Sequence, residues 1–134
     1  MKKIFFLLIV VFCFNSLYAQ KKKSIQMHKI KSITVYNADY EVNNGKQIKE
    51  SFERYDDFGN MVEEIEYDKK GVEKKHILSE YDDEGNKTKE TFLMTNGIKE
   101  KIIEYKYDDG LKTERIVYSG NGKIKSKKKY VYEN

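Results

Sequence analysis

Short segments rich in Ile, Val, Tyr, Thr and Phe alternate along this chain with short polar segments that contain glycine. Within the apolar segments, hydrophobic and polar positions tend to alternate residue by residue. In "MVEEIEY", for example, this period places Met61, Ile65 and Tyr67 on one face. A two-residue period is typical of a half-buried strand. The segments between glycines are also too short for an amphipathic helix with its caps, so the pattern predicts strands.

The glycines recur at nearly constant intervals of 12 to 14 residues, which indicates an internal repeat. Most of them follow Asn, Asp or a short polar run, as in "YDDFGN" at 55–60 and "YDDEGN" at 81–86. Asn-Gly and Asp-Gly favour two-residue type I′ hairpin turns. The "DDFG" and "DDEG" forms favour a type I turn, which an Asp opens and a left-handed Gly closes. The seven predicted turn glycines are Gly45, Gly59, Gly71, Gly85, Gly97, Gly110 and Gly122.

The spacing predicts an all-β fold: an antiparallel meander of about eight strands, joined by tight turns that contain glycine. Strands linked this tightly pair with their chain neighbours. Such a sheet is expected to hide one apolar face, either as a single curled sheet or by closing toward a barrel. The first strand is the longest, and "YNADY" at 36–40 could break it with a bulge. The expected strands are 26–42, 46–56, 60–68, 72–82, 86–95, 98–108, 111–119 and 123–133.

The chain begins with a segment typical of a secretory signal peptide. Lys2 and Lys3 precede an apolar run of eleven residues, and small residues follow near Ala19. The run is shorter than the roughly 20 residues that a membrane span needs. We therefore expect residues 1–19 to be removed, leaving residues 20–134 as one β-repeat domain that is secreted or periplasmic and has no membrane span. Removing residues 1–19 also removes Cys13, the only cysteine, so no disulfide is expected.

Charge gives little support for a nucleic-acid partner. The net charge of the whole chain is +4, and both signs are interleaved along it. A nucleic-acid binder usually gathers its basic residues on one face. The basic clusters at 21–23 and 125–129 are explained as a solvated terminus and a solvated strand face.

Candidate chemistry is sparse. The paired acids of the turns could hold a weakly bound cation, but they lack the spacing of an EF-hand, and an Asp that caps a turn already explains them. His28 and His76 lie 48 positions apart and have no cysteine to join them in a zinc site. "SGNGK" at 119–123 lacks the spacing of a phosphate loop. We expect no metal, no cofactor and no catalytic group. The alternative is an envelope polymer hydrolase that uses an acid pair such as Glu64 and Glu104.

Tyrosine is the most conspicuous residue type, with eleven in the chain. Several lie just before turns, where rings on neighbouring strands could stack as a structural ladder. Alternatively, exposed rings such as those of Tyr67 and Tyr105 could form platforms that bind a glycan or a peptide.

The segments "YDDFGN", "YDKKGV" and "YDDEGN", each followed by a charged strand and another Tyr, resemble the YD repeat of Rhs-type proteins. The pattern is also similar to short MORN-like β-repeats. The resemblance covers about residues 34 to 134 and implies consecutive β-hairpins. The chain has far fewer repeats than the large Rhs shell, so the resemblance implies no activity. We expect a non-enzymatic protein with a binding or scaffold role in the cell envelope, whose partner is a protein or an envelope glycan.

Overall fold

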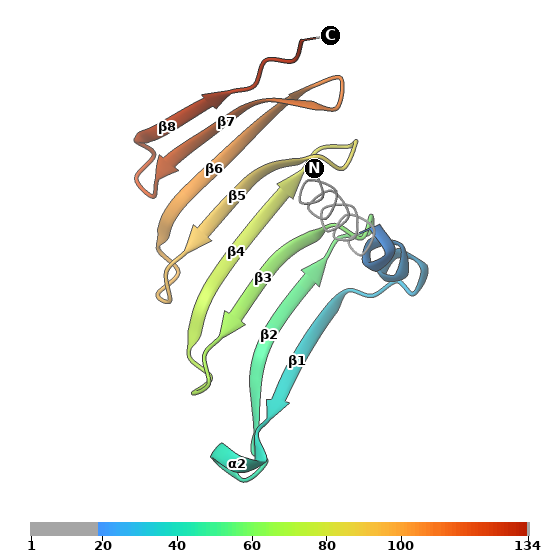
Figure 1. Cartoon of the computed structure of the whole chain (residues 1–134), viewed down its shortest axis with the longest axis vertical. Coiled ribbons are helices and arrows are strands. Elements are labelled where there is room, and N and C mark those ends of the chain that lie inside the picture. The colour runs from blue at the N-terminus through green and yellow to red at the C-terminus, as the bar shows by residue number, and fades with distance from the viewer. Residues whose placement is uncertain (1–18, 134) are drawn as a thin grey trace, which may run out of the picture.

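The computed structural model describes residues 19–133 and consists mainly of one eight-stranded antiparallel sheet (Figure 1). The strands follow one another in chain order, β1-β2-β3-β4-β5-β6-β7-β8, which confirms the predicted meander. The sheet stays open, so β1 and β8 are its two edges. The strands are β1 (Ser32–Ala38), β2 (Gln47–Tyr55), β3 (Met61–Tyr67), β4 (Glu73–Tyr81), β5 (Lys87–Leu93), β6 (Lys99–Asp108), β7 (Leu111–Ser119) and β8 (Ile124–Lys129).

The predicted first strand, 26–42, is wrong at both ends. Residues 19–27 are helical, and β1 occupies only the middle of the expected range. A four-residue helix, α2 (Tyr40–Asn43), follows β1 in place of a tight turn. Asp39 begins α2 by accepting hydrogen bonds from the backbone N–H groups of Glu41 and Val42, and Asn44 ends it in a left-handed conformation.

All seven predicted turn glycines have positive φ, between 72° and 85°. At residues 56–60 the Gly59 N–H donates to the Asp56 carbonyl (3.1 Å), and the Asp56 N–H donates to the Asn60 carbonyl (3.0 Å). The same two bonds recur at 68–72, 82–86, 94–98 and 119–123. This is a type I turn closed by a left-handed glycine, as predicted for the Asp-Asp turns.

Within residues 19–133, two turns have the positive φ pair of the type I′ form. At the end of α2, Asn44 and Gly45 have φ of 55° and 74°, and the Lys46 N–H donates to the Asn43 carbonyl (3.2 Å). The second of these turns joins β6 directly to β7. Asp109 and Gly110 both have positive φ, at 50° and 73°. The turns at Asn96-Gly97 and Asn121-Gly122 adopt the three-residue form instead, with Gly97 and Gly122 bonded to the residue three positions earlier. The Asn-Gly dipeptide therefore located these turns correctly but did not determine their type.

Each hairpin also contains a β-bulge on its returning strand. In six of the seven hairpins the bulged residue lies three positions after the turn glycine. A bulge changes which face the following residues point to. The bulge at Val62 places Met61 on the same face as Tyr55 and places Ile65 on the opposite face. The simple alternation that grouped Met61 with Ile65 was therefore wrong. The bulged residues are Glu50, Val62, Lys74, Thr88, Glu100, Thr113 and Lys125.

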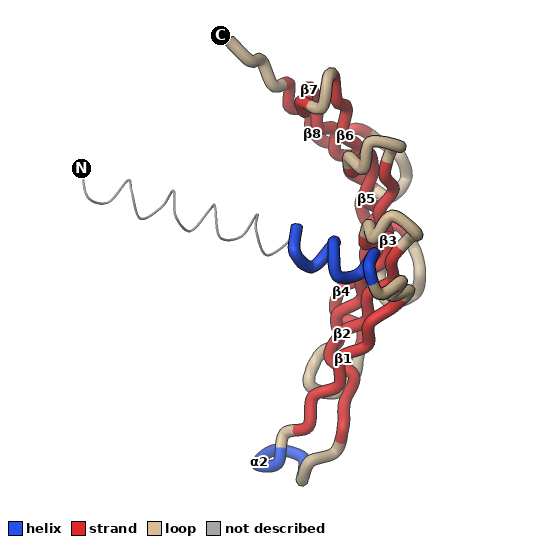
Figure 2. The backbone as a smooth tube through the Cα atoms, turned by 90° about the vertical axis from the view of Figure 1, so that its right-hand side faces the viewer, coloured by secondary structure: helices blue, strands red, loops and turns tan. Residues whose placement is uncertain are grey.

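Viewed from its side, the sheet is a single curved and twisted layer (Figure 2). We call the face that carries Ile77 the front face. Ile77 and Ile103 are buried on the front face and Ile116 on the back face, while no described side chain is less than 2% exposed. The expectation of one hidden apolar face is therefore not met, because both faces share a thin core and neither is covered by a second layer.

The helix at residues 19–27 lies against one end of the front face, beside the Asp56–Asn60 turn (Figure 1). Its Ile25 is only 3% exposed. No helix among residues 19–133 is long and apolar enough to cross a membrane. Residues 1–18, which hold nearly all of the predicted signal segment, lie outside the described residues.

Candidate functional site

Three tyrosines form hydrogen bonds across adjacent strands: from β4 to β3, from β6 to β5, and from the segment after β8 to β7. The hydroxyl groups of Tyr81, Tyr107 and Tyr132 donate to main-chain carbonyls twenty residues earlier, at distances of 2.8 to 3.0 Å. The acceptors are the carbonyls of Met61, Lys87 and Lys112. A phenol engaged in this way stabilises the sheet and is not free for a ligand, which favours the structural ladder over a binding role for these rings.

The two tyrosines singled out as possible binding residues do not form one platform. Tyr67 ends β3 and alternates with Glu66, so it lies on the back face. Tyr105, on β6, lies on the front face with Ile103. Lysine ammonium groups also lie over both rings, at 5.2 Å for Lys49 over Tyr67 and 4.4 Å for Lys112 over Tyr105. A planar ligand would have to displace these lysines to stack on either ring.

Tyr67 also borders a small cavity between α2 and the turn that follows β3. The cavity has a volume of about 170 Å³. This is below the roughly 300–1,000 Å³ typical of small-molecule sites. Asn43, which has a buried side-chain oxygen without a hydrogen-bond partner, and Lys49 are among its other lining residues. The cavity could accept only a small group.

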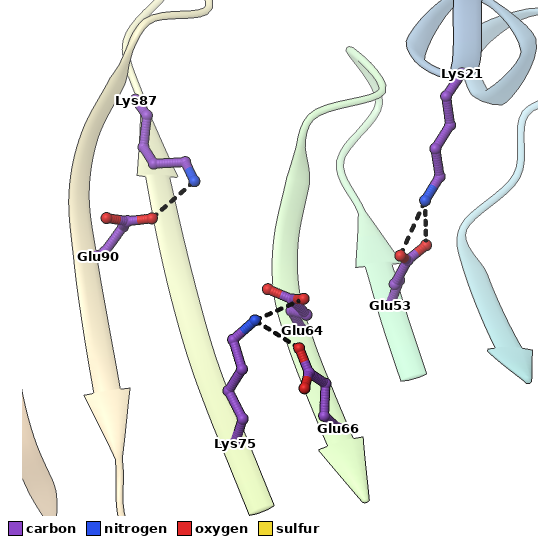
Figure 3. A network of polar contacts seen from close by, with 7 residues as sticks. All are labelled: Lys21, Glu53, Glu64, Glu66, Lys75, Lys87 and Glu90. Atoms are coloured by element: carbon purple, nitrogen blue, oxygen red, sulfur yellow. Dashed lines mark hydrogen bonds and ion pairs between the residues drawn. The ribbon is translucent and has the colours of Figure 1, made fainter. Parts of the chain in front are cut away.

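The front face carries a row of ion pairs (Figure 3). Lys75 lies between Glu64 and Glu66, at 2.9 and 2.7 Å from their carboxylate oxygens. Lys87 is 2.9 Å from Glu90. Although these pairs are partly buried, ion pairs at a protein surface contribute only roughly 0–1 kcal/mol each. Their regular placement therefore fixes side-chain positions more than it stabilises the fold.

Hydrogen bonds across this row alter the acidity of its members. Burial raises the pKa of Tyr105 to about 12, assisted by the hydrogen bond that its hydroxyl donates to Glu90 (2.6 Å). Burial opposes ionisation of Glu90, but the hydrogen bonds from Tyr105 and Lys87 outweigh it and lower the pKa of this carboxyl. Glu90 is therefore held as a carboxylate, which suits a structural acceptor and not a general acid.

The turn acids act as caps. Asp56 Oδ1 accepts from the backbone N–H groups of Phe58 (2.9 Å) and Asn60 (2.8 Å), and Asp82 makes the same contacts with Glu84 (3.1 Å) and Asn86 (2.8 Å). Within residues 19–133, no three His, Cys, Asp or Glu side chains are grouped so that they could hold a metal ion.

The two histidines lie in unrelated places. His28 follows the N-terminal helix, whereas His76 lies on the back face of β4. His76 Nε2 is 2.9 Å from Glu63 and its Nδ1 is 3.5 Å from Glu73. Arg54 also contacts Glu63 (2.8 Å), so His76 belongs to a local ion-pair group.

The acid pair of the hydrolase alternative is not brought together. Glu64 lies on the front face of β3, opposite Ile77, whereas Glu104 lies on the back face of β6. Three strand spacings separate them, which is about 14 Å in addition to the thickness of the sheet. Glycosidases need their two carboxyl groups roughly 5 to 9.5 Å apart across a cleft.

The two open edges of the sheet differ sharply in charge. Four of the six residues of β8 are lysine, and all six are exposed. By contrast β1, with the sequence SITVYNA, has no charged residue in a chain that is 36% charged. Edge lysines protect a sheet against pairing with another chain, whereas a neutral edge rich in β-branched residues invites it.

The hydrogen-bond pattern shows which main-chain groups of β1 are open. The Tyr55 N–H donates to the Lys31 carbonyl (2.9 Å), so residue 31 faces β2. Because an antiparallel ladder alternates, Ile33 and Val35 also bond to β2, and Ser32 and Thr34 direct their N–H and C=O groups outward. Val35 and Tyr36 are 41% and 57% exposed. Within residues 19–133, the outer edge of β1 is therefore open to pairing with another strand.

Two features were missed by reasoning from the sequence. Gly120 was left out of the glycine series, yet a Cβ at this position would lie 1.7 Å from the Lys99 carbonyl oxygen. The helix at 19–27 was also missed, because "QKKKSIQMH" shows a single strongly apolar docking residue, Ile25, and no helical period. The charge contrast between β1 and β8, however, could be read directly from the sequence.

No family model matches this chain, and a search of the curated proteins found no relative of it.

Proposed function

We propose that this is a secreted or periplasmic β-repeat protein without enzymatic activity that binds or scaffolds protein in the cell envelope. Binding would occur by addition of an extended strand at the edge of β1. Strand addition supplies affinity through main-chain hydrogen bonds, and the side chains on both faces supply specificity. The observation that carries this proposal is the open, uncharged edge of β1 beside an otherwise densely charged sheet.

A protein partner is favoured over an envelope glycan. Glycan binding through Tyr67 or Tyr105 would require free ring faces, and lysines lie over both rings. An incoming strand needs only the outward backbone groups of Ser32 and Thr34, which make no bond to β2. The separation of Glu64 from Glu104 gives no support to the hydrolase alternative.

The proposal is tested by retention of envelope proteins on the immobilised protein, with two substitutions at one position. Thr34→Pro removes an outward N–H that β2 does not use, a place where an edge strand tolerates proline. Thr34→Val keeps the N–H, the shape and the neutral charge. We expect identified proteins to be retained by the parent and by Thr34→Val and lost with Thr34→Pro. Equal retention by all three would contradict the proposal, as would turnover in a hydrolase screen that a single Glu→Gln change abolishes.

A further inference from the structure

We infer that the strand that pairs with β1 is β1 of a second copy of the same chain, in an antiparallel arrangement that joins two sheets into one. This inference rests on the proposed function, because it names the partner of the edge described above. The remainder of the structure favours a self-complementary partner in two independent ways, through side-chain pairing and through charge.

Side-chain pairing is favourable when the two-fold axis passes through Thr34. Ser32 and Thr34 point their backbone groups outward, so Thr34 of one copy can exchange both main-chain bonds with Thr34 of the other. On the front face, Ile33 then lies opposite Val35 of the second copy. On the back face, Thr34 meets Thr34, and Ser32 meets Tyr36. Apolar β-branched pairs and Thr–Thr pairs are among the stabilising cross-strand combinations.

The charges that flank β1 are also complementary. Lys29 precedes the strand, beside a Lys31 that is already paired with Asp57 of its own chain, and Asp39 and Glu41 follow the strand. An antiparallel pair with its axis at Thr34 places the basic end of each strand beside the acidic end of the other. A parallel pair would bring like charges together. Complementary charges at the ends of a neutral strand fix both the orientation and the register of pairing.

Strand β8 makes the assembly stop at two copies. Its four lysines lack acidic counterparts on β1, so a β1–β8 contact between copies would bury positive charge against a neutral strand. A β8–β8 contact would place lysines opposite lysines. The symmetric β1–β1 contact therefore closes as a dimer and leaves protected edges at both ends.

The first test is the molar mass of the purified protein, measured by sedimentation equilibrium over a dilution series. We expect a monomer–dimer equilibrium that Thr34→Val preserves. Thr34→Lys should weaken it at least tenfold, because two lysines would meet at the axis. A parent protein that remains monomeric throughout overturns the inference, and so does a dimer that Thr34→Lys leaves unchanged.

A charge exchange tests the orientation. In this register Lys29 lies opposite Asp39 of the second copy, so Lys29→Asp alone and Asp39→Lys alone each create like-charge contacts at both ends of the pair and should weaken the dimer by roughly threefold to tenfold. The double variant restores opposite charges and should return the dissociation constant to within about twofold of the parent. Failure of the double variant to recover would contradict the antiparallel arrangement.

A single cysteine tests the register, in a Cys13→Ser background. Thr34→Cys places two thiols on the axis and should give a disulfide-linked dimer on mild oxidation. Tyr36→Cys places them about 13 Å apart, beyond the reach of a disulfide, and should not. Equal cross-linking at both positions overturns the proposed register.

These results separate the inference from the function on which it rests. A monomeric parent whose retention of envelope proteins still depends on Thr34 would refute the second copy as partner and leave strand addition standing. A monomeric parent whose retention is indifferent to Thr34 would refute both.

Discussion

Tyr81, Tyr107 and Tyr132 each reach a main-chain carbonyl twenty residues back along the chain, and every hairpin between them turns on a left-handed glycine. These contacts involve the backbone and recur with the repeat. Buried apolar side chains are few by comparison, with Ile77 and Ile103 on one face and Ile116 on the other. At the scale of residues, turn geometry and tyrosine hydrogen bonds between adjacent strands therefore supplement a small apolar core, to which Tyr55 and Ile25 also belong.

The turn glycines should differ in how poorly they tolerate alanine. Each glycine-to-alanine substitution forces a residue with a Cβ atom into the left-handed region, at a cost of about 1–2 kcal/mol. A Cβ at Gly97 would meet open space, whereas a Cβ at Gly59 would lie 2.7 Å from Gln26 Cγ and 3.1 Å from the Lys22 carbonyl. Urea denaturation should show Gly59→Ala to be more destabilising than Gly97→Ala. The assignment is wrong if the two variants are equally stable, or if neither differs from the parent.

Acid should weaken the turn caps. Hydrogen bonds from the backbone N–H groups of Val72 (2.9 Å) and Lys70 (2.8 Å) lower the pKa of Asp68. A carboxyl whose pKa is lower in the folded state stabilises the fold above its unfolded pKa of about 3.9. That contribution is lost as the pH falls through the folded pKa.

The free energy of unfolding, measured in urea from neutral pH downward, should therefore fall below about pH 4. The fall should be shallower in Asp68→Asn, which keeps a side-chain oxygen but does not titrate. Identical pH profiles for the parent and Asp68→Asn would show that this cap does not contribute.

At the scale of elements, the sequence predicted the existence and order of the strands because each glycine has one dominant physical role. Prediction from the sequence failed for features that involve only a few residues. Asp39 and Asn44 cap a single helical turn, and four helical residues are too few to show a period. The bulges were missed for a related reason, since a single unpaired residue such as Val62 leaves no mark in composition. The candidate binding edge was identified from the lack of charged residues in β1, and this feature is visible in the sequence.

The helix at residues 19–27 should contribute to stability through one side chain. Ile25 is 3% exposed, whereas Met27 in the same helix is 67% exposed. Truncation of a buried isoleucine to alanine costs about 2–5 kcal/mol. Ile25→Ala should therefore lower the free energy of unfolding by about 2 kcal/mol or more, and Met27→Ala should change it by less than about 0.5 kcal/mol. Comparable effects in chemical denaturation would mean that the helix does not dock as described.

At the scale of the whole molecule, a single-layer sheet exposes both faces and two edges, and its edges differ in charge. The sequence predicted the open meander among its alternatives, but it could not decide between an open sheet and a closed one. That choice depends on accumulated twist and on the bulges, which act over the whole sheet.

Export is a separate property of the whole chain, and it stays a prediction. If residues 1–19 are a signal peptide, the exported protein should begin at Gln20. Intact-mass measurement of protein from the envelope or culture fraction gives the answer directly. A mass that includes residues 1–19 would indicate an uncleaved anchor.

The central claim is that the molecule binds through the edge of β1. Amide hydrogen exchange tests this most directly, with the dilute purified protein compared with the same protein in concentrated envelope extract. Because Ser32 and Thr34 have no bond partner in β2, their amides should exchange quickly in the dilute protein and become protected in the extract, while β8 stays unchanged. Protection that appears at β8 or at the inner strands β2 to β7, with β1 unaltered, would contradict the account.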